Sequence, residues 1–201
     1  MFLGAVVAFA FAFEAVNART PLDAKGPVTL HGAADEKPPA ESPFRVPKHQ
    51  YTGVKMCKTC HSKQKLGGEE YPVWEKLAHA KAYKTLASPA AKKIAADLGI
   101  ADPQKDPGCL KCHTTAHGVD AKWRGKRLTL EEGVSCEACH GPGKDYKGKK
   151  VMEDHAASLA AGMVIPNEKT CRACHNEESP TYREFEYEKA LKKIQHWPAK
   201  K

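Results

Sequence analysis

The sequence lacks most features of a membrane protein or of a large apolar core. Only 7% of its 201 residues are aromatic, 41% are hydrophobic, and the mean hydropathy is −0.56. The one distinct apolar run, Gly4–Phe13, is too short to cross a bilayer. No segment shows the sustained alternation of apolar and polar residues that predicts β-strands. We therefore expect little or no β-sheet, no integral membrane segment, and an interior filled by something other than side chains.

The first residues are typical of an export signal, although no basic residue precedes the apolar run. Small residues at Val16 and Ala18 suit cleavage after Ala18, which predicts a signal peptide over residues 1–18. A buried helix is the alternative interpretation. Residues 19–47 contain six prolines and scattered charges, as in a flexible linker. The folded domain should span residues 48–201 and lie in the periplasm, which argues against nucleic acid as a partner.

The formal net charge is +8. Such an excess of basic residues favours attraction to an acidic partner or to a membrane surface. It is also compatible with a soluble basic protein that uses its charge for nothing more specific.

Cysteine occurs in one pattern only, Cys-x-x-Cys-His, which is the signature of c-type haem attachment. Cysteines three residues apart lie one helical turn apart, so both sulfurs can form thioethers with one haem while the adjacent histidine binds the iron. Zinc sites and disulfides also use paired cysteines, but neither requires a histidine after the second one. The four motifs predict four covalently bound haem c groups, attached through Cys57, Cys60, Cys109, Cys112, Cys136, Cys139, Cys171 and Cys174, with iron ligands His61, His113, His140 and His175.

Four haems in a domain of this size must lie close together and form most of its interior. The expected fold class is therefore mainly α with long loops, a multihaem cytochrome c with a haem-packed core. Haems this close can pass electrons to one another. Helices are expected over residues 72–87, 89–98 and 151–159, and in a long C-terminal segment that begins at Ser179-Pro180 and ends at Pro198.

Six histidines remain as candidates for the second axial position of each iron. His79 has small neighbours, His155 lies on a predicted short helix, and His196 ends the C-terminal helix, so we expect these three to coordinate iron. His117 follows His113 by four residues, on the wrong side of that haem. His49 borders the linker and His31 lies within it. One haem is thus left open, or is ligated by one of these weaker candidates.

Several blocks of sequence resemble the tetrahaem cytochrome c-554 family. They are Tyr51–His61, His79–Tyr83, Cys109–His113, Glu132–Gly143, Cys171–Asn176, Ser179–Tyr182 and Ile194–His196. The resemblance covers about residues 50–197 and implies a helical fold with haems in parallel and perpendicular pairs. It further implies three haems with two histidines each and one five-coordinate haem. The implied pairs are His61 with His155, His140 with His79, and His175 with His196, which leaves His113 open.

The resulting hypothesis is a periplasmic carrier that moves electrons between redox partners and is not an enzyme. Its donor could be a hydroxylamine oxidoreductase-like protein, as the resemblance implies, or a membrane quinol-linked cytochrome. Two alternatives stay open. One is reduction of nitric oxide or a similar small nitrogen oxide at the open haem, and the other is a role as a subunit of a larger cytochrome assembly.

Overall fold

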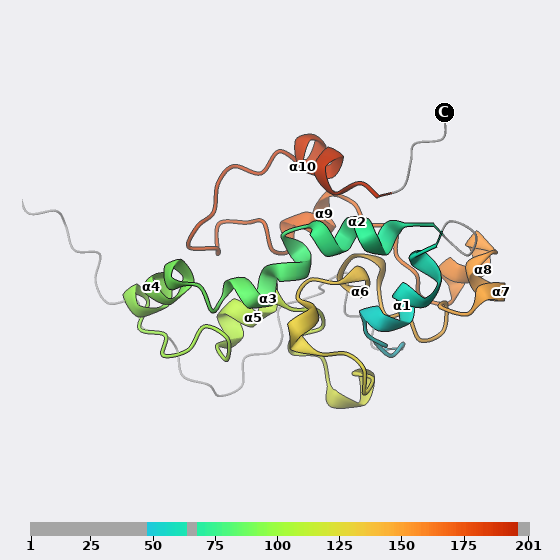
Figure 1. The fold of residues 1–201 in the computed structure, drawn as a ribbon, viewed down its shortest axis with the longest axis horizontal. Coiled ribbons are helices and arrows are strands. Elements are labelled where there is room, and N and C mark those ends of the chain that lie inside the picture. Colours follow the sequence, from blue (N-terminus) through green and yellow to red (C-terminus); the bar gives the residue numbers. More distant parts are fainter. Residues whose placement is uncertain (1–47, 64–67, 197–201) are drawn as a thin grey trace, which may run out of the picture. The chain divides into compact units, whose positions relative to one another are not determined.

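The computed structural model describes residues 48–63 and 68–196, so the predicted signal peptide, the linker, His31 and Pro198 lie outside the described residues. The described part consists of short helices joined by long loops (Figure 1). Its only strand-like pairings are two isolated bridges, Tyr51 with Arg124 and Lys63 with Gly68. The mainly helical fold class is thereby confirmed. The elements are α1 (Val54–His61), α2 (Glu70–Lys76), η1 (His79–Lys81), α3 (Ala82–Thr85), α4 (Pro89–Asp97), α5 (Pro107–His113), η2 (Ala121–Trp123), η3 (Leu130–Glu132), α6 (Cys136–His140), α7 (Lys149–Met152), α8 (His155–Ala160), α9 (Glu168–Arg172) and α10 (Tyr187–Ile194).

The helix predicted over residues 72–87 is broken into α2, η1 and α3. Leu77 ends α2 in an extended conformation. Beyond it, the carbonyl of His79 accepts two hydrogen bonds, one from the Ala82 N–H that closes η1 and one from the Val134 N–H at 3.0 Å. Gly133 permits this approach, since a Cβ there would stand 2.7 Å from the His79 carbonyl oxygen. The break therefore ties the His79 segment to the chain just before the third Cys-x-x-Cys-His motif.

The sequence signals at helix ends predict α4 correctly, but the predictions for residues 151–159 and for the C-terminal helix differ from the structure. Ser88 caps α4 by accepting a hydrogen bond from the Ala91 N–H, and Gly99 follows the helix with φ +72°. The segment around residues 151–159 forms two helices, because Asp154 caps a new one, α8. The long C-terminal helix was predicted to begin at Ser179-Pro180, but α10 begins at Tyr187.

The chain has very little apolar core of its own. Within the described residues, the buried hydrophobic side chains are Tyr51, Val54, Leu86, Ala95, Leu110 and Tyr146. Ordering a domain of this length costs far more conformational entropy than the burial of six side chains offsets. So small a core agrees with the expectation from the sequence that another apolar group fills the interior.

Two buried carboxylates hold α1 in place. Glu137, which is 0% exposed, accepts hydrogen bonds from the N–H groups of Thr52 (2.8 Å) and Gly53 (2.7 Å). Glu132 accepts from the Val54 N–H at 3.0 Å and from the Ser135 hydroxyl at 2.6 Å. Burial raises the pKa of both carboxyl groups, and these hydrogen bonds oppose the shift. The start of the first motif helix is thus fixed to the segment that carries the third motif.

Candidate functional site

All four motifs place their two cysteines one turn apart. α1, α5 and α6 contain a complete motif each, while α9 holds Cys171 and ends just before Cys174. The turn nevertheless continues, because the N–H groups of Cys174 and His175 both donate to the Cys171 carbonyl, at 3.2 and 2.9 Å. Local capping explains two of these helices. Asp106 caps α5, and Asn167 forms a capping box with Thr170 at the start of α9.

Three of the motif histidines have the Nδ1 atom engaged. His113 Nδ1–H donates to the carbonyl of Ala82 at 2.8 Å, and His140 Nδ1–H donates to that of Val164 at 3.2 Å. His61 Nδ1 instead lies 2.9 Å from the Glu70 carboxylate. An imidazole that donates from Nδ1 presents its Nε2 lone pair outward, which is the arrangement of a histidine that binds metal through Nε2. These partners orient the rings for coordination.

The fourth motif histidine is held differently. The His175 ring stacks on Phe185 with centroids 4.8 Å apart and an interplanar angle of 16°. Arg172 Nη2 donates to the Phe185 carbonyl at 3.3 Å. These contacts draw residues just after Ser179-Pro180 onto the fourth motif and explain why α10 begins later than predicted.

Two predicted distal histidines face motif histidines. The His79 and His175 ring centroids are 6.0 Å apart at 85°, and those of His140 and His196 are 6.0 Å apart at 81°. Two imidazoles that share one metal need about 2 Å for each metal–nitrogen bond and about 1 Å from each nitrogen to its ring centre, so about 6 Å in all. Burial lowers the pKa of His79, His140 and His175, which favours the neutral form that binds metal.

These two pairs are the reverse of those that the resemblance implied. His79 lies opposite His175 and not His140, while His196 lies opposite His140 and not His175. The order of the histidines along the chain does not determine which motif each of them reaches, because the loops between the motifs fold back on one another. His155 is exposed at the start of α8, and no contact recorded for the described residues joins it to His61.

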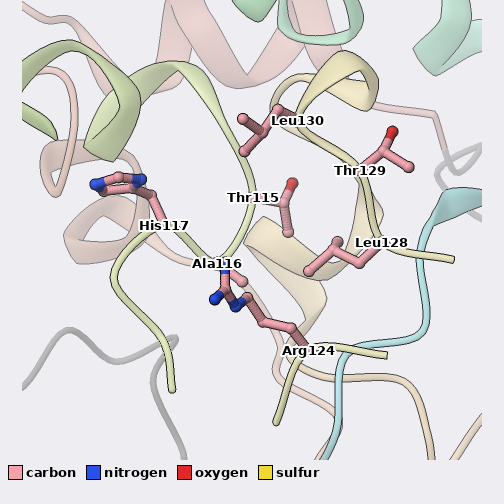
Figure 2. A pocket seen from close by; sticks show the side chains of 7 residues that line it. All are labelled: Thr115, Ala116, His117, Arg124, Leu128, Thr129 and Leu130. Atoms are coloured by element: carbon pink, nitrogen blue, oxygen red, sulfur yellow. The ribbon is translucent and has the colours of Figure 1, made fainter. Parts of the chain in front are cut away.

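The two weaker candidates have other surroundings. His49 Nδ1 lies 2.7 Å from Asp145 Oδ2, and its ring covers Gly162, where a Cβ would stand 2.6 Å from His49 Cδ2. His117 lines a cavity of about 210 Å³ that follows the second motif (Figure 2). The other lining residues are Thr115, Ala116, Arg124, Leu128, Thr129 and Leu130. In Figure 2 the Arg124 guanidinium lies beside Ala116, and the His117 ring lies to one side of the cluster.

Cysteines of different motifs touch one another. The Cys57 thiol hydrogen-bonds to Cys136, and this contact together with burial holds the pKa of Cys57 above its ordinary value. A hydrogen bond between Cys112 and Cys174 lowers the pKa of Cys112 to about 7. Burial and the nearby Cys171 raise the pKa of Cys139 to about 11. An ion pair between Lys111 and Glu178 also joins the second and fourth motifs.

The donor set fits haem c better than the alternatives. All eight cysteines are free thiols, so none of them forms a disulfide. Among the residues that the structure describes, no group of three or more His, Cys, Asp or Glu side chains could hold a metal ion alone, as a zinc site would require. Each motif instead offers two sulfurs and one oriented imidazole, which is the donor set that haem c needs. Three carboxylates that support this arrangement, Glu70, Glu132 and Glu137, have no signal in the sequence that singles them out.

Within the described ranges, no helix has the length and apolar character needed to cross a membrane.

Comparisons with known proteins agree with this arrangement. Residues 56–141 match the family described as cytochrome c554 and c-prime. The chain is 32% identical over 157 residues to cytochrome c-554 of Nitrosomonas europaea, covering 68% of this chain and 59% of that protein. It is also 39% identical over 62 residues to a cytochrome c-552 of Bacteroides thetaiotaomicron, covering 31% of this chain and 12% of that protein. The chain thus spans less than two thirds of the length of these relatives.

The fold leads to the same group of proteins. The structure of reduced cytochrome c554 from Nitrosomonas europaea matches with a TM-score of 0.50 and 26% identity, over 72% of this chain and 78% of that one. Covalent haem c is implied by this likeness, and electron transfer is what such proteins carry out. The chain belongs to the cytochrome c554 family of multihaem c-type cytochromes.

Proposed function

We propose that this protein carries electrons through four haem c groups held by its four Cys-x-x-Cys-His motifs. Each haem supplies one-electron chemistry when bound. The chain attaches it through the two motif cysteines and orients the motif histidine by the contacts of its ring. The observation that carries the proposal is that cysteines of different motifs lie side by side, which brings the attachment sites of neighbouring haems close together.

These contacts order the motifs in space. Cys57 touches Cys136, which joins the first motif to the third. Cys139 lies within electrostatic reach of Cys171, which joins the third to the fourth, and Cys174 touches Cys112, which joins the fourth to the second. The order along this line is first, third, fourth, second. Residues far apart in the sequence thus form a continuous path with the first and second motifs at its ends.

His79 and His196 are the proposed distal ligands of the fourth and third haems, since their rings face His175 and His140. His155 stays the candidate for the first haem. His79→Ala and His196→Ala should each convert one haem in four from low spin to high spin in electron paramagnetic resonance. Phe185→Leu, which alters the surroundings of His175, should shift the high-spin signal of the His79→Ala protein and leave that of His196→Ala unchanged. The opposite result would restore the pairing that the resemblance implied.

The carrier function is tested by redox titration of the matured protein. For a carrier we expect four one-electron steps. Dithionite should reduce the protein, and a second cytochrome should reoxidise it faster than the protein binds any small ligand. A colourless protein, or a mass equal to that of the bare polypeptide, would end the proposal.

The donor and acceptor are redox proteins, with a hydroxylamine oxidoreductase-like protein and a membrane quinol-linked cytochrome as candidate donors. Periplasmic location is part of the proposal, and release by osmotic shock tests it.

One observation favours a second function at the second motif. Among the described ring contacts, His140 and His175 have a second imidazole opposite them, whereas His61 and His113 do not, and only for His61 is a distal candidate, His155, still proposed. A position left open there would bind small ligands such as nitric oxide. Cyanide should then shift the spectrum of one haem only, and steady consumption of nitric oxide by the reduced protein would favour a reductase over a carrier. A stable assembly with other cytochromes in sedimentation would instead support a role as a subunit.

A further inference from the structure

A short basic segment, which we call the basic loop, packs against the start of the first motif helix. It consists of residues 120–127 and carries Lys122, Arg124, Lys126 and Arg127 with a single carboxylate, Asp120, so its formal charge is +3. All four cationic residues are exposed. Asp120 lies 3.6 Å from Lys122 Nζ, which leaves most of the positive charge of the loop without a partner inside the loop.

The basic loop is held rigidly. The Tyr51 N–H donates to the Trp123 carbonyl and the Gly125 N–H donates to the Tyr51 carbonyl, both at 2.8 Å, and Tyr51 is 2% exposed. Two glycines allow this close approach. A Cβ on Gly125 would stand 2.4 Å from the Tyr51 carbonyl oxygen, and one on Gly53 would stand 2.4 Å from that of Arg127. The backbone that carries the four cations is therefore held in place before any partner arrives.

The loop also touches the first motif directly. Arg127 Nη1 lies 2.7 Å from the sulfur of Met56, the residue before Cys57. α1 itself adds two exposed cations, Lys55 and Lys58. Acidic side chains also lie nearby. Glu75 and Glu131 line a second cavity with Lys55 and Arg127, and the Glu75 carboxylate accepts a hydrogen bond from the Tyr71 hydroxyl. Lys122 and Lys126 are not among the residues that line that cavity.

The chain around the fourth motif has the opposite balance. Residues 177–193 carry five carboxylates and four cations, for a formal charge of −1. Exposed positive charge thus lies against the first motif helix, at one end of the line of motifs, and a second basic stretch, residues 76–96 with five lysines and no carboxylate, lies elsewhere in the chain. A rigid cationic surface beside a terminal redox centre suits electrostatic docking of a protein with an acidic surface.

We propose that the basic loop is the docking surface for an acidic redox protein that exchanges electrons with the first haem. This inference rests on the proposed carrier function and adds to it the site of exchange and the charge of the partner. Electrons would then enter or leave at the first motif, and the second motif would serve the other partner.

The test uses the matured protein and photoreduced flavodoxin, an acidic electron donor, as the probe. Lys122→Glu with Lys126→Glu should slow the second-order reduction rate about tenfold at low ionic strength, and the difference should vanish at high salt, where exposed charges are screened. The matched control is Lys92→Glu with Lys93→Glu on α4, which lies well away from α1 (Figure 1) and gives the same change in net charge. The control should retain at least half of the wild-type rate.

Two further outcomes separate the possible failures. Equal slowing of both double variants would show that only net charge matters and would overturn the docking surface. An unchanged rate in the Lys122/Lys126 variant would overturn it as well. Dithionite, which needs no docking, should reduce all four haems in each variant. If the wild-type protein takes no electrons from dithionite, the carrier function itself fails.

Discussion

Replacement of Glu70 by Gln should raise the reduction potential of the first haem and leave the other three unchanged. Within the described part of the chain, Glu70 is the one carboxylate that lies against a motif histidine. Its Oε2 lies 2.9 Å from His61 Nδ1, and the side chain is only 14% exposed. The corresponding partners of His113 and His140 are neutral carbonyl groups. A carboxylate strengthens the histidine as an electron donor and stabilises the oxidised, more positive state of the iron.

The size of the effect follows from the geometry. The distance from the carboxylate to the iron is the sum of three lengths: the hydrogen bond to His61, about 2 Å across the imidazole ring, and about 2 Å for the metal–nitrogen bond. The carboxylate therefore lies roughly 7 Å from the iron. At an effective dielectric constant of about 20, one unit charge at roughly that distance contributes about 2 kcal/mol. A free energy of about 1.4 kcal/mol changes an equilibrium constant tenfold, and a tenfold change corresponds to about 59 mV for one electron. The upper limit of the shift in reduction potential is therefore about 100 mV. Glutamine keeps part of the hydrogen bond, so we expect a rise of about 50–100 mV.

Spectroelectrochemical titration of the wild-type and Glu70→Gln proteins measures the four midpoints. The matched control is Glu75→Gln on the same helix, because Glu75 is exposed and bonds to Tyr71 instead of a motif histidine. One midpoint should rise in Glu70→Gln and none should move by more than a small amount in Glu75→Gln. A uniform shift of all four midpoints in both variants, or no shift in either, would refute the assignment of Glu70 to the first haem.

Three further predictions follow from the contacts around the motifs. Gly68→Ala should reproduce the shift of Glu70→Gln in the same titration, because a Cβ at this position would stand 2.1 Å from Glu70 Oε1. It should also lower the free energy of unfolding in urea by about 1–3 kcal/mol, because Gly68 has φ +127°. Glu137→Gln should cost about 2–4 kcal/mol, since an amide leaves buried N–H donors without an acceptor, whereas Glu131→Gln at an exposed site should change the free energy of unfolding by less than about 0.5 kcal/mol. The polypeptide made without haem should show no cooperative unfolding transition in circular dichroism, and a sharp transition would mean that its side chains form a sufficient core.

The local parts of this protein could be predicted from the sequence, and the long-range parts could not. Attachment of haem c requires a fixed spacing of three residue types, so the motif itself specifies where cysteines and histidine lie on a helical turn. The start of α4 was likewise predictable, because Ser88 and Pro89 act on neighbouring residues. His79 and His175 are 96 positions apart, and no local pattern shows that their rings meet.

Two of the three wrong helix predictions have the same cause. A Ser-Pro pair at 179–180 favours a helix start by itself, but Phe185 lies against His175 and its carbonyl accepts a hydrogen bond from Arg172. The predicted helix of residues 72–87 is interrupted at the extended Leu77, and the turn that follows is tied to Val134, whose N–H donates to the His79 carbonyl. In both places a contact between distant segments outweighs the intrinsic preference of the chain. These contacts position the histidines, so the breaks in helix are part of the site.

The ends of the line of motifs differ in a way that gives it a direction. The first motif has a carboxylate on its histidine, which lowers the potential there, whereas His113 of the second motif bonds to the neutral carbonyl of Ala82. The exposed cations of the basic loop act in the opposite sense, but water and salt screen them more than they screen the nearly buried Glu70. The carboxylate should therefore dominate, and electrons that arrive at the first haem should move toward the second. The basic loop then sets how fast an acidic donor arrives, while Glu70 sets how strongly its electron is passed on.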